Sequence, residues 1–529
     1  MTSLTNEKPL DADIWLRDPQ AMQCFYNELL EYIVNKVWSR AGQDRLQKQT
    51  IREYLLRSAG SAGRYSEEEY EALADTFDDE PADPVPIFEV ERIIKLAPLT
   101  FESIAFPAND ARLGHNYIAL LENLNSIRFT NCSFYTNQLE LQHTSICFDR
   151  CIFFTDWNTQ IPAALHDFET LYQECTFKAC LNINGRYCDP VEIGRYRSLL
   201  RDCALKQVLI SKIEIDSKLF ENSSNYQQRI ESLEIHSAKL KRSFILRKTK
   251  AERIFFSDTT FSRKFELKDC IVREFKSDNT NFKQVSDFNS SRFLVFFIYK
   301  SVFFDFAALE NCQFGYSEDS SREQEESAGA RLTYATFYSF INFRNSTFHR
   351  QLDLRNSNRK ELPNFLGCTF KPDACRQTDR ETFRIIKHSF DMIGNRVDAN
   401  RYYALEMQAY LRELKEQGSR SERFILWCNG WMSNYGQSYI RPIVLIMLCM
   451  LFMYGIRTGY EGNWLYEIHP PANPIISLLA GQLNGWSKSL AVFKPLMLEG
   501  MEFVSLLFGV IFSALIWQAV VAIKRHTVR

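Results

Sequence analysis

Apolar residues repeat along this chain with different periods, and each period predicts a different kind of element. Between about Asn125 and Phe370, large apolar residues recur every five residues or at twice that spacing. Before about residue 100 and after Phe370 the apolar spacing is helical, and two long uncharged runs lie near the C-terminus. The pattern predicts a helical N-terminal domain over 1–100, a repeat domain over 120–375 and helices beyond it.

The central repeat combines a large residue with a small one two positions earlier. Cys132 precedes Phe134, Thr280 precedes Phe282 and Cys368 precedes Phe370 in this way. Neither a helix nor a simple alternating strand has a five-residue period, whereas a parallel β-solenoid can have one. The large residue would fill the axis, and the small one would let the turn close. The residues expected in the solenoid core are Phe134, Phe153, Phe261, Phe282, Phe293, Phe314, Phe348 and Phe370.

Four segments interrupt the repeat. Residues 156–173, 189–207 and 216–229 break the period and are expected to be inserted helices or loops, and 317–327 is a charged loop. Insertions in repeat proteins gather on one face, which often binds other molecules. We therefore expect these segments to contact a protein partner.

Helical signals flank the repeat on both sides. In the N-terminal domain they predict helices from Asp18-Pro19 to about residue 42, over 46–59, and over 66–77, followed by an acidic linker at 78–84. After the repeat, Phe383, Ile386 and Phe390 mark the first helix of an amphipathic hairpin over 376–420.

The C-terminal region 435–529 is expected to be a membrane hairpin. Residues 503–523 form a run of 21 without charge, which as a helix is roughly 32 Å long and crosses a bilayer core. Residues 442–456 form a run of 15, which can span if Arg441 and Arg457 snorkel at its ends. The spans are set at 440–457 and 503–523. Basic residues before the first span and at the C-terminus predict that both termini are cytoplasmic.

Two features of this region bear on how it packs. Ser505, Gly509 and Ser513 recur every four residues, which permits either self-association of chains or close packing against the first span. Between the spans one helical stripe is apolar, and it either lies in the outer interface or re-enters the membrane as a pore helix. Its residues are Ile476, Leu479, Leu483, Trp486 and Leu490.

The five-residue spacing resembles that of the pentapeptide-repeat family, in a degenerate, Phe-rich form. The segment 398–407, the later Tyr435-Gly436 and Arg441-Pro442 pairs and the basic tail Lys524-Arg525 resemble the C-terminal module of membrane-associated bacterial members. The resemblance implies a mainly β fold: a right-handed quadrilateral β-solenoid with a helical head and two C-terminal transmembrane helices. It also implies a multi-pass protein of the bacterial inner membrane.

The net charge and the motifs of the chain limit the classes of partner and reaction that can be expected. The 529-residue chain has 63 Lys and Arg against 65 Asp and Glu, and residues 233–315 carry a net charge of +5. This net charge argues against an acidic mimic of duplex DNA, and it falls short of a strong nucleic-acid-binding patch, so we expect no nucleic-acid partner. The chain has no phosphate-binding Gly-rich loop, no His-Glu-x-x-His pair and no G-x-S-x-G elbow.

The histidines and cysteines do not predict a reactive centre. No two of the eight histidines lie within four residues of each other, and the 14 cysteines are scattered as in a reduced cytosolic protein. His143 lies near Cys147 and Cys151, where packing is a better interpretation than a metal. We therefore expect no catalytic, cofactor-binding or metal-ligating residues, and no enzyme activity.

Two functions remain. The first is a non-enzymatic scaffold or sensor, anchored in the lipid bilayer, whose solenoid binds a protein partner. The alternative is an oligomerising membrane effector or pore of the toxin or defence type, triggered through the solenoid.

Overall fold

The computed structural model describes residues 19–41, 47–61, 90, 92–94, 98–108, 117–139, 141, 144–159, 168–185, 196–224, 226–316, 328–417, 419–461, 481–484 and 502–527. The chain divides into two compact units, Met1–Ala374 and Cys375–Arg529. Each unit is described by itself below.

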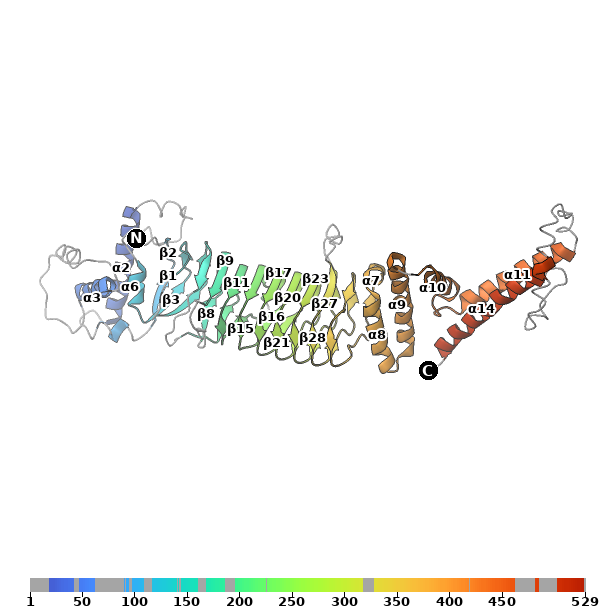
Figure 1. The fold of residues 1–529 in the computed structure, drawn as a ribbon. Helices are drawn as coiled ribbons and strands as arrows, with labels where there is room; N and C mark the ends of the chain where they lie inside the picture. Colours follow the sequence, from blue (N-terminus) through green and yellow to red (C-terminus); the bar gives the residue numbers. More distant parts are fainter. Residues whose placement is uncertain are drawn as a thin grey trace. The chain divides into compact units, whose positions relative to one another are not determined.

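The first unit contains a parallel β-solenoid of about ten turns, which confirms the prediction of a mainly β solenoid. Its strands follow one another along the coil axis (Figure 1). The described strands form four sheets, and all of their pairings are parallel. The first sheet contains β1 (Leu99–Glu102), β3 (Ser126–Thr130), β5 (Ser145–Asp149), β8 (Thr170–Gln173), β10 (Ser198–Arg201) and β13 (Lys218–Glu221).

The second sheet is the longest and runs through the whole solenoid. It contains β2 (Ala105–Phe106), β4 (Ser133–Phe134), β6 (Ile152–Phe153), β7 (Trp157–Thr159), β9 (Thr176–Asn184), β11 (Ala204–Ser211), β14 (Arg229–His236), β17 (Lys250–Ser257), β20 (Ile271–Asp278), β23 (Arg292–Tyr299), β26 (Gln313–Phe314), β27 (Gly329–Thr333), β30 (Thr347–Phe348), β31 (Leu352–Asp353) and β33 (Thr369–Phe370).

Two shorter sheets complete the coils in the later part of the solenoid. The third contains β12 (Glu214–Ile215), β15 (Lys239–Leu240), β18 (Thr260–Phe261), β21 (Asn281–Phe282), β24 (Val302–Phe303), β28 (Thr336–Phe337) and β32 (Asn358–Arg359). The fourth contains β16 (Phe244–Arg247), β19 (Phe265–Lys268), β22 (Ser286–Asp287), β25 (Ala307–Ala308) and β29 (Ile341–Asn342).

One central coil takes 21 residues. Phe244 pairs in register with Phe265, and Phe261 pairs with Phe282. The ten- or eleven-residue spacing seen in the sequence is therefore half a coil, and it alternates between two sheets. Phe282 belongs to the third sheet, whereas Phe293 belongs to the second. The eight phenylalanines expected in the core are all buried.

The coil bends at residues in the left-handed backbone region. Asn131, Asp258 and Asn279 have φ angles of 54°, 49° and 45°, and Asn and Asp are the non-glycine residues that tolerate this region best. A small buried residue follows each of them. For example, the Thr259 hydroxyl donates to the Ile235 carbonyl of the preceding coil at 3.1 Å. The residue at this position must therefore be small enough for the turn to close, and its side chain also donates a hydrogen bond to the preceding coil.

The boundaries and interruptions of the solenoid differ from the sequence-based prediction. The first strand, β1, begins at Leu99, before the boundary of residue 120. The segments 156–173, 189–207 and 216–229 contain β7, β8, β10 and β13 and the start of β11, so the prediction that they are insertions throughout is wrong. Their outward positions carry polar residues that hide the period, while the inward positions Leu199 and Leu219 remain buried.

Helices cover the N-terminal end of the solenoid. The described ones are α2 (Pro19–Ala41), α3 (Lys48–Ser61) and α6 (Tyr117–Glu122). Phe25 of α2 meets the ring of Phe106 edge-on with centroids 6.0 Å apart, and Tyr32 stacks on Phe101 at 5.5 Å. A terminal coil exposes its core at one end, and such capping removes that apolar surface from water.

The second unit is helical in its described part. Its helices are α8 (Arg380–Met392), α9 (Arg396–Gln417), α10 (Arg420–Ser433), α11 (Ile440–Glu461) and α14 (Glu502–Thr527), and α7 (Pro372–Gln377) crosses the boundary from the first unit. Asp379 caps α8 by accepting from the Thr382 amide at 2.9 Å. Phe390 and Tyr402 stack at 5.4 Å and join α8 to α9. The separate helix α10 was not expected from the sequence.

Several predictions lie outside the described residues. These are the helix over 66–77, the linker over 78–84, the loop over 317–327 and four residues of the candidate re-entrant helix: Ile476, Leu479, Trp486 and Leu490.

Candidate functional site

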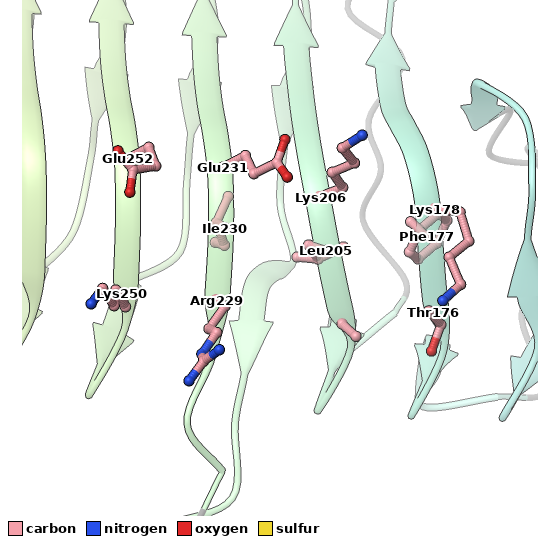
Figure 2. A pocket seen from close by; sticks show the side chains of 11 residues that line it. Thr176, Phe177, Lys178, Leu205, Lys206, Arg229, Ile230, Glu231, Lys250 and Glu252 are labelled. Atoms are coloured by element: carbon pink, nitrogen blue, oxygen red, sulfur yellow. The ribbon is translucent and has the colours of Figure 1, made fainter.

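The solenoid has an open groove of about 510 Å³ on the second sheet. Its lining comes from three consecutive residues on each of β9, β11 and β14 and two residues on β17 (Figure 2). The lining residues are Thr176, Phe177, Lys178, Ala204, Leu205, Lys206, Arg229, Ile230, Glu231, Lys250 and Glu252.

Along each strand of the groove, successive side chains point alternately into the solenoid core and toward the surface. Phe177, Leu205 and Ile230 are buried in the solenoid, because successive side chains in a strand point to opposite faces. Their neighbours Lys178, Lys206 and Glu231 are exposed. The apolar side chains of the lining therefore point into the solenoid, and the charged ones point to solvent.

Register gives the groove a divided charge. Leu205 pairs with Phe177, which sets Lys206 beside Lys178, and Ile230 pairs with Ala251, which sets Glu231 beside Glu252. Figure 2 shows Glu252, Glu231 and Lys206 at one level on three neighbouring strands, and Lys178 on the fourth strand with its amine pointing toward Thr176. Arg229 and Lys250 lie nearer the beginnings of their strands. The ladder register shifts between Leu205 and Gln207, and such a shift twists the strand locally.

The neighbouring surface arranges its charges differently. Further along the same strands, the Arg253 guanidinium of β17 donates to Glu274 of β20 at 2.9 Å and also faces Glu234 of β14 at 4.0 Å. Arg253 and Lys276 hold the pKa of Glu274 below its usual range despite the opposing effect of burial. Opposite charges pair with one another on that surface. In the groove, neighbouring strands set lysine beside lysine and glutamate beside glutamate, and Glu252 also faces Arg273 of the next coil at 3.9 Å. Such a surface suits a polar partner with separated charges.

Three buried cysteines form hydrogen bonds between successive coils of the solenoid. Cys132, Cys151 and Cys175 follow one another at the same corner, and their thiols donate to the carbonyls of Phe101, Phe129 and Phe148 at 3.3–3.4 Å. Burial raises the pKa of Cys147 to about 12. Among the described residues, no three His, Cys, Asp or Glu side chains are grouped so that they could hold a metal ion; His143 lies outside that part of the chain.

Two helices of the second unit are long and apolar enough to cross a membrane. The candidate spans are Ile440–Gly459 in α11 and Glu502–Arg525 in α14, with mean hydropathies of 1.8 and 2.4. Only 6% and 22% of these windows are buried, so they are unlike the core helices of a globular protein. The two helices pack against each other, and Phe452 contacts Phe508 with ring centroids 5.9 Å apart.

The small-residue stripe of α14 is split between interior and surface. Ser505 and Gly509 are buried within the chain, whereas Ser513 is exposed. The Ser513 hydroxyl donates to the Gly509 carbonyl of its own helix at 2.9 Å. Leu483, the one described member of the candidate re-entrant stripe, lies in a helical segment at 481–484 and is partly exposed.

Sequence reasoning missed two features. The groove joins residues from four coils, and only their alternation of apolar and charged positions hinted at a surface. The second feature is α10, on which Phe424, Trp427 and Trp431 are 64%, 54% and 58% exposed. Their i, i+3, i+7 spacing was the signal that could have predicted one face of a helix.

Comparison with known proteins gives no relative for this chain. Neither the family models nor the curated proteins nor the solved structures that were searched match it.

Proposed function

We propose that this chain is a non-enzymatic scaffold or sensor, anchored in a membrane by α11 and α14, whose solenoid groove binds a protein partner. The observation that carries the proposal is the combination, in one chain, of the charge-divided groove and two exposed apolar helices. A long solenoid gives an extended rigid surface, and exposed helices of this length need lipid around them.

The finer parts of the proposal rest on the resemblance noted above. We place the protein with the membrane-associated, right-handed quadrilateral pentapeptide-repeat proteins of the bacterial inner membrane, with both termini cytoplasmic. The basic residues Arg441, Lys524 and Arg525 at one end of the two spans support that orientation.

A charge-reversal experiment on full-length protein tests the scaffold. A photo-crosslinking amino acid at Gln207, beside the groove, should capture a discrete partner in a bacterial host. The double variant Lys178→Glu/Lys206→Glu should reduce the captured band at least tenfold, because the groove would then set negative charges beside Glu231 and Glu252. The matched double variant Arg263→Glu/Lys360→Glu, at exposed positions away from the groove, should leave it unchanged. Equal capture by all three proteins would contradict the scaffold.

The pore alternative has less support. Burial of Ser505 and Gly509 within one chain favours packing inside the hairpin over packing between chains. Ion leakage on expression, abolished by Gly509→Leu in protein that still enters the membrane, would favour the pore instead.

A further inference from the structure

Two adjoining cavities lie where α9, the turn after α10 and the end of α14 meet. One, of about 290 Å³, is lined in part by Arg401, Gly436 and Arg525. The other, of about 360 Å³, is lined in part by Arg396 and Lys524. The two share Asn400 and Arg525 in their linings. We call them together the junction pocket.

Arg525 lines both cavities of the junction pocket and contacts residues of α9 and of the turn after α10. Its guanidinium donates to the Tyr435 carbonyl and lies 4.4 Å from the centroid of the Tyr403 ring. Its own carbonyl accepts from the Asn400 amide at 3.1 Å. Gly436 has φ +79°, and a Cβ added there would lie 2.7 Å from Arg525 Nη1. The absence of a side chain at Gly436 therefore leaves space for the Arg525 guanidinium. The contacts with Tyr435 and Tyr403 fix the orientation of the guanidinium and so of its other N–H groups.

Positive charge dominates around Arg525. Arg396, Arg401 and Lys524 are all exposed along the cavity walls. Two carboxylates also line the pocket, Asp391 and Asp398. Asp398 accepts from the Asn395 amide at 2.7 Å. Four cations against two carboxylates, one of them engaged by a side-chain amide, leave a site suited to an anion with several oxygens.

The depth of the pocket along α14 favours an anion that belongs to a lipid. The apolar run of α14 ends at Ile523, so Lys524 and Arg525 stand at headgroup level if this helix spans. The helix α10, which contacts both α11 and α14, has an exposed aromatic face. Phe424 and Trp427 stack at 6.3 Å, and Trp427 and Trp431 at 6.5 Å. Exposed aromatic residues beside basic ones are typical of a helix lying in the interface.

We propose that the junction pocket binds the phosphate of an anionic phospholipid headgroup, with Arg396, Arg401, Lys524 and Arg525 as its donors. The inference rests on the proposed membrane anchoring. It adds a lipid-selective site at the base of the hairpin, where a basic pocket between helices can select anionic lipid.

Lipid binding is measured on full-length protein in detergent by native mass spectrometry, with phosphatidylglycerol and phosphatidylcholine as probes. We expect preferential retention of phosphatidylglycerol, and a drop of roughly fivefold for each cation removed in Arg396→Gln and Arg401→Gln. Arg384→Gln is the matched control, since Arg384 is an exposed arginine of α8 that lines neither cavity. It should retain the wild-type preference.

Three outcomes would overturn the lipid site. These are equal retention of both lipids by the wild type, equal loss in Arg384→Gln and Arg401→Gln, and displacement of the lipid by millimolar inorganic phosphate, which would identify a soluble anion as the ligand. Carbonate extraction of the same protein from membranes tests the anchor separately. Protein that resists extraction but shows no lipid preference retains the anchor and loses only the lipid site.

Discussion

The phenyl rings of Phe282 and Phe303 lie parallel across two consecutive coils, with centroids 4.5 Å apart and planes inclined by 9°. The next ring in the column, Phe337, continues the stack at 4.8 Å. Rings from different columns meet edge to face instead, as Phe265 does with Phe282 at 75°. Both arrangements are favourable for aromatic pairs, so the core combines stacked columns with perpendicular contacts between them.

Removing one ring from a column should weaken the whole solenoid. Phe282→Ala deletes a fully buried ring that contacts rings above and below, and we expect a loss of about 3–5 kcal/mol in the free energy of unfolding. Urea unfolding followed by circular dichroism measures it. Phe304→Ala, at a 40% exposed ring, is the control and should lose less than half as much. Equal losses would mean that the column contributes little.

The corners of the coil offer a stabilising substitution. Glu174 has φ 52°, a region that is unfavourable for most L-residues and that Asn tolerates better. Glu174→Asn should therefore raise the free energy of unfolding by up to about 1 kcal/mol. The control Glu361→Asn changes an exposed residue without positive φ and should have almost no effect. A destabilised Glu174→Asn protein would argue against strain at this corner.

Acid should weaken the solenoid partly through Glu266. This carboxylate is 1% exposed and pairs with Arg247 and Lys264. Burial opposes ionisation, but these two cations hold the pKa of Glu266 below its usual value. A depressed folded-state pKa stabilises the protein above the unfolded pKa, and this contribution disappears as pH falls through the folded value.

The variant Glu266→Gln tests this contribution of the Glu266 carboxylate. It should lose about 2 kcal/mol at pH 7, where charged hydrogen bonds are replaced by neutral ones. The difference from the wild type should shrink as the pH falls below about 4, because the wild-type carboxyl is then protonated as well. Chemical denaturation across pH 3–7 measures both. A difference that stays constant with pH would contradict the ion pairs as its source.

The buried thiols should resist alkylation. Burial raises the pKa of Cys270, Cys312 and Cys368 to about 12, so at pH 8 roughly one thiol in ten thousand is a thiolate, the reactive form. In native protein treated with iodoacetamide, peptide mass spectrometry should find the exposed Cys24 modified well before these three. After denaturation all four should react at similar rates. Early modification of Cys312 in folded protein would contradict its burial.

The sequence determined those features that depend on local spacing. A large residue two positions after a small one is enough to identify an inward pair, as Cys132 and Phe134 show, because the coil bends at the same place each time. Length and absence of charge were likewise enough to locate α11 and α14. The interruptions were overestimated, since outward polar residues in β10 and β13 conceal strands whose inward residues are regular.

Tertiary structure alone decided which distant residues became neighbours. The charges that line the groove are neighbours because of the length of each coil and the register shift after Leu205. Neither the coil length nor the register shift can be predicted from the types of residue in the sequence. The residues concerned are Lys178, Lys206, Glu231 and Glu252. Arg525 likewise meets Tyr435 across 90 positions because α14 returns along α11. The alternation of large and small residues acts over a few neighbouring positions, so it can be recognised in the sequence. The contacts that create a binding surface join distant residues, and they depend on the geometry of all the chain that lies between those residues.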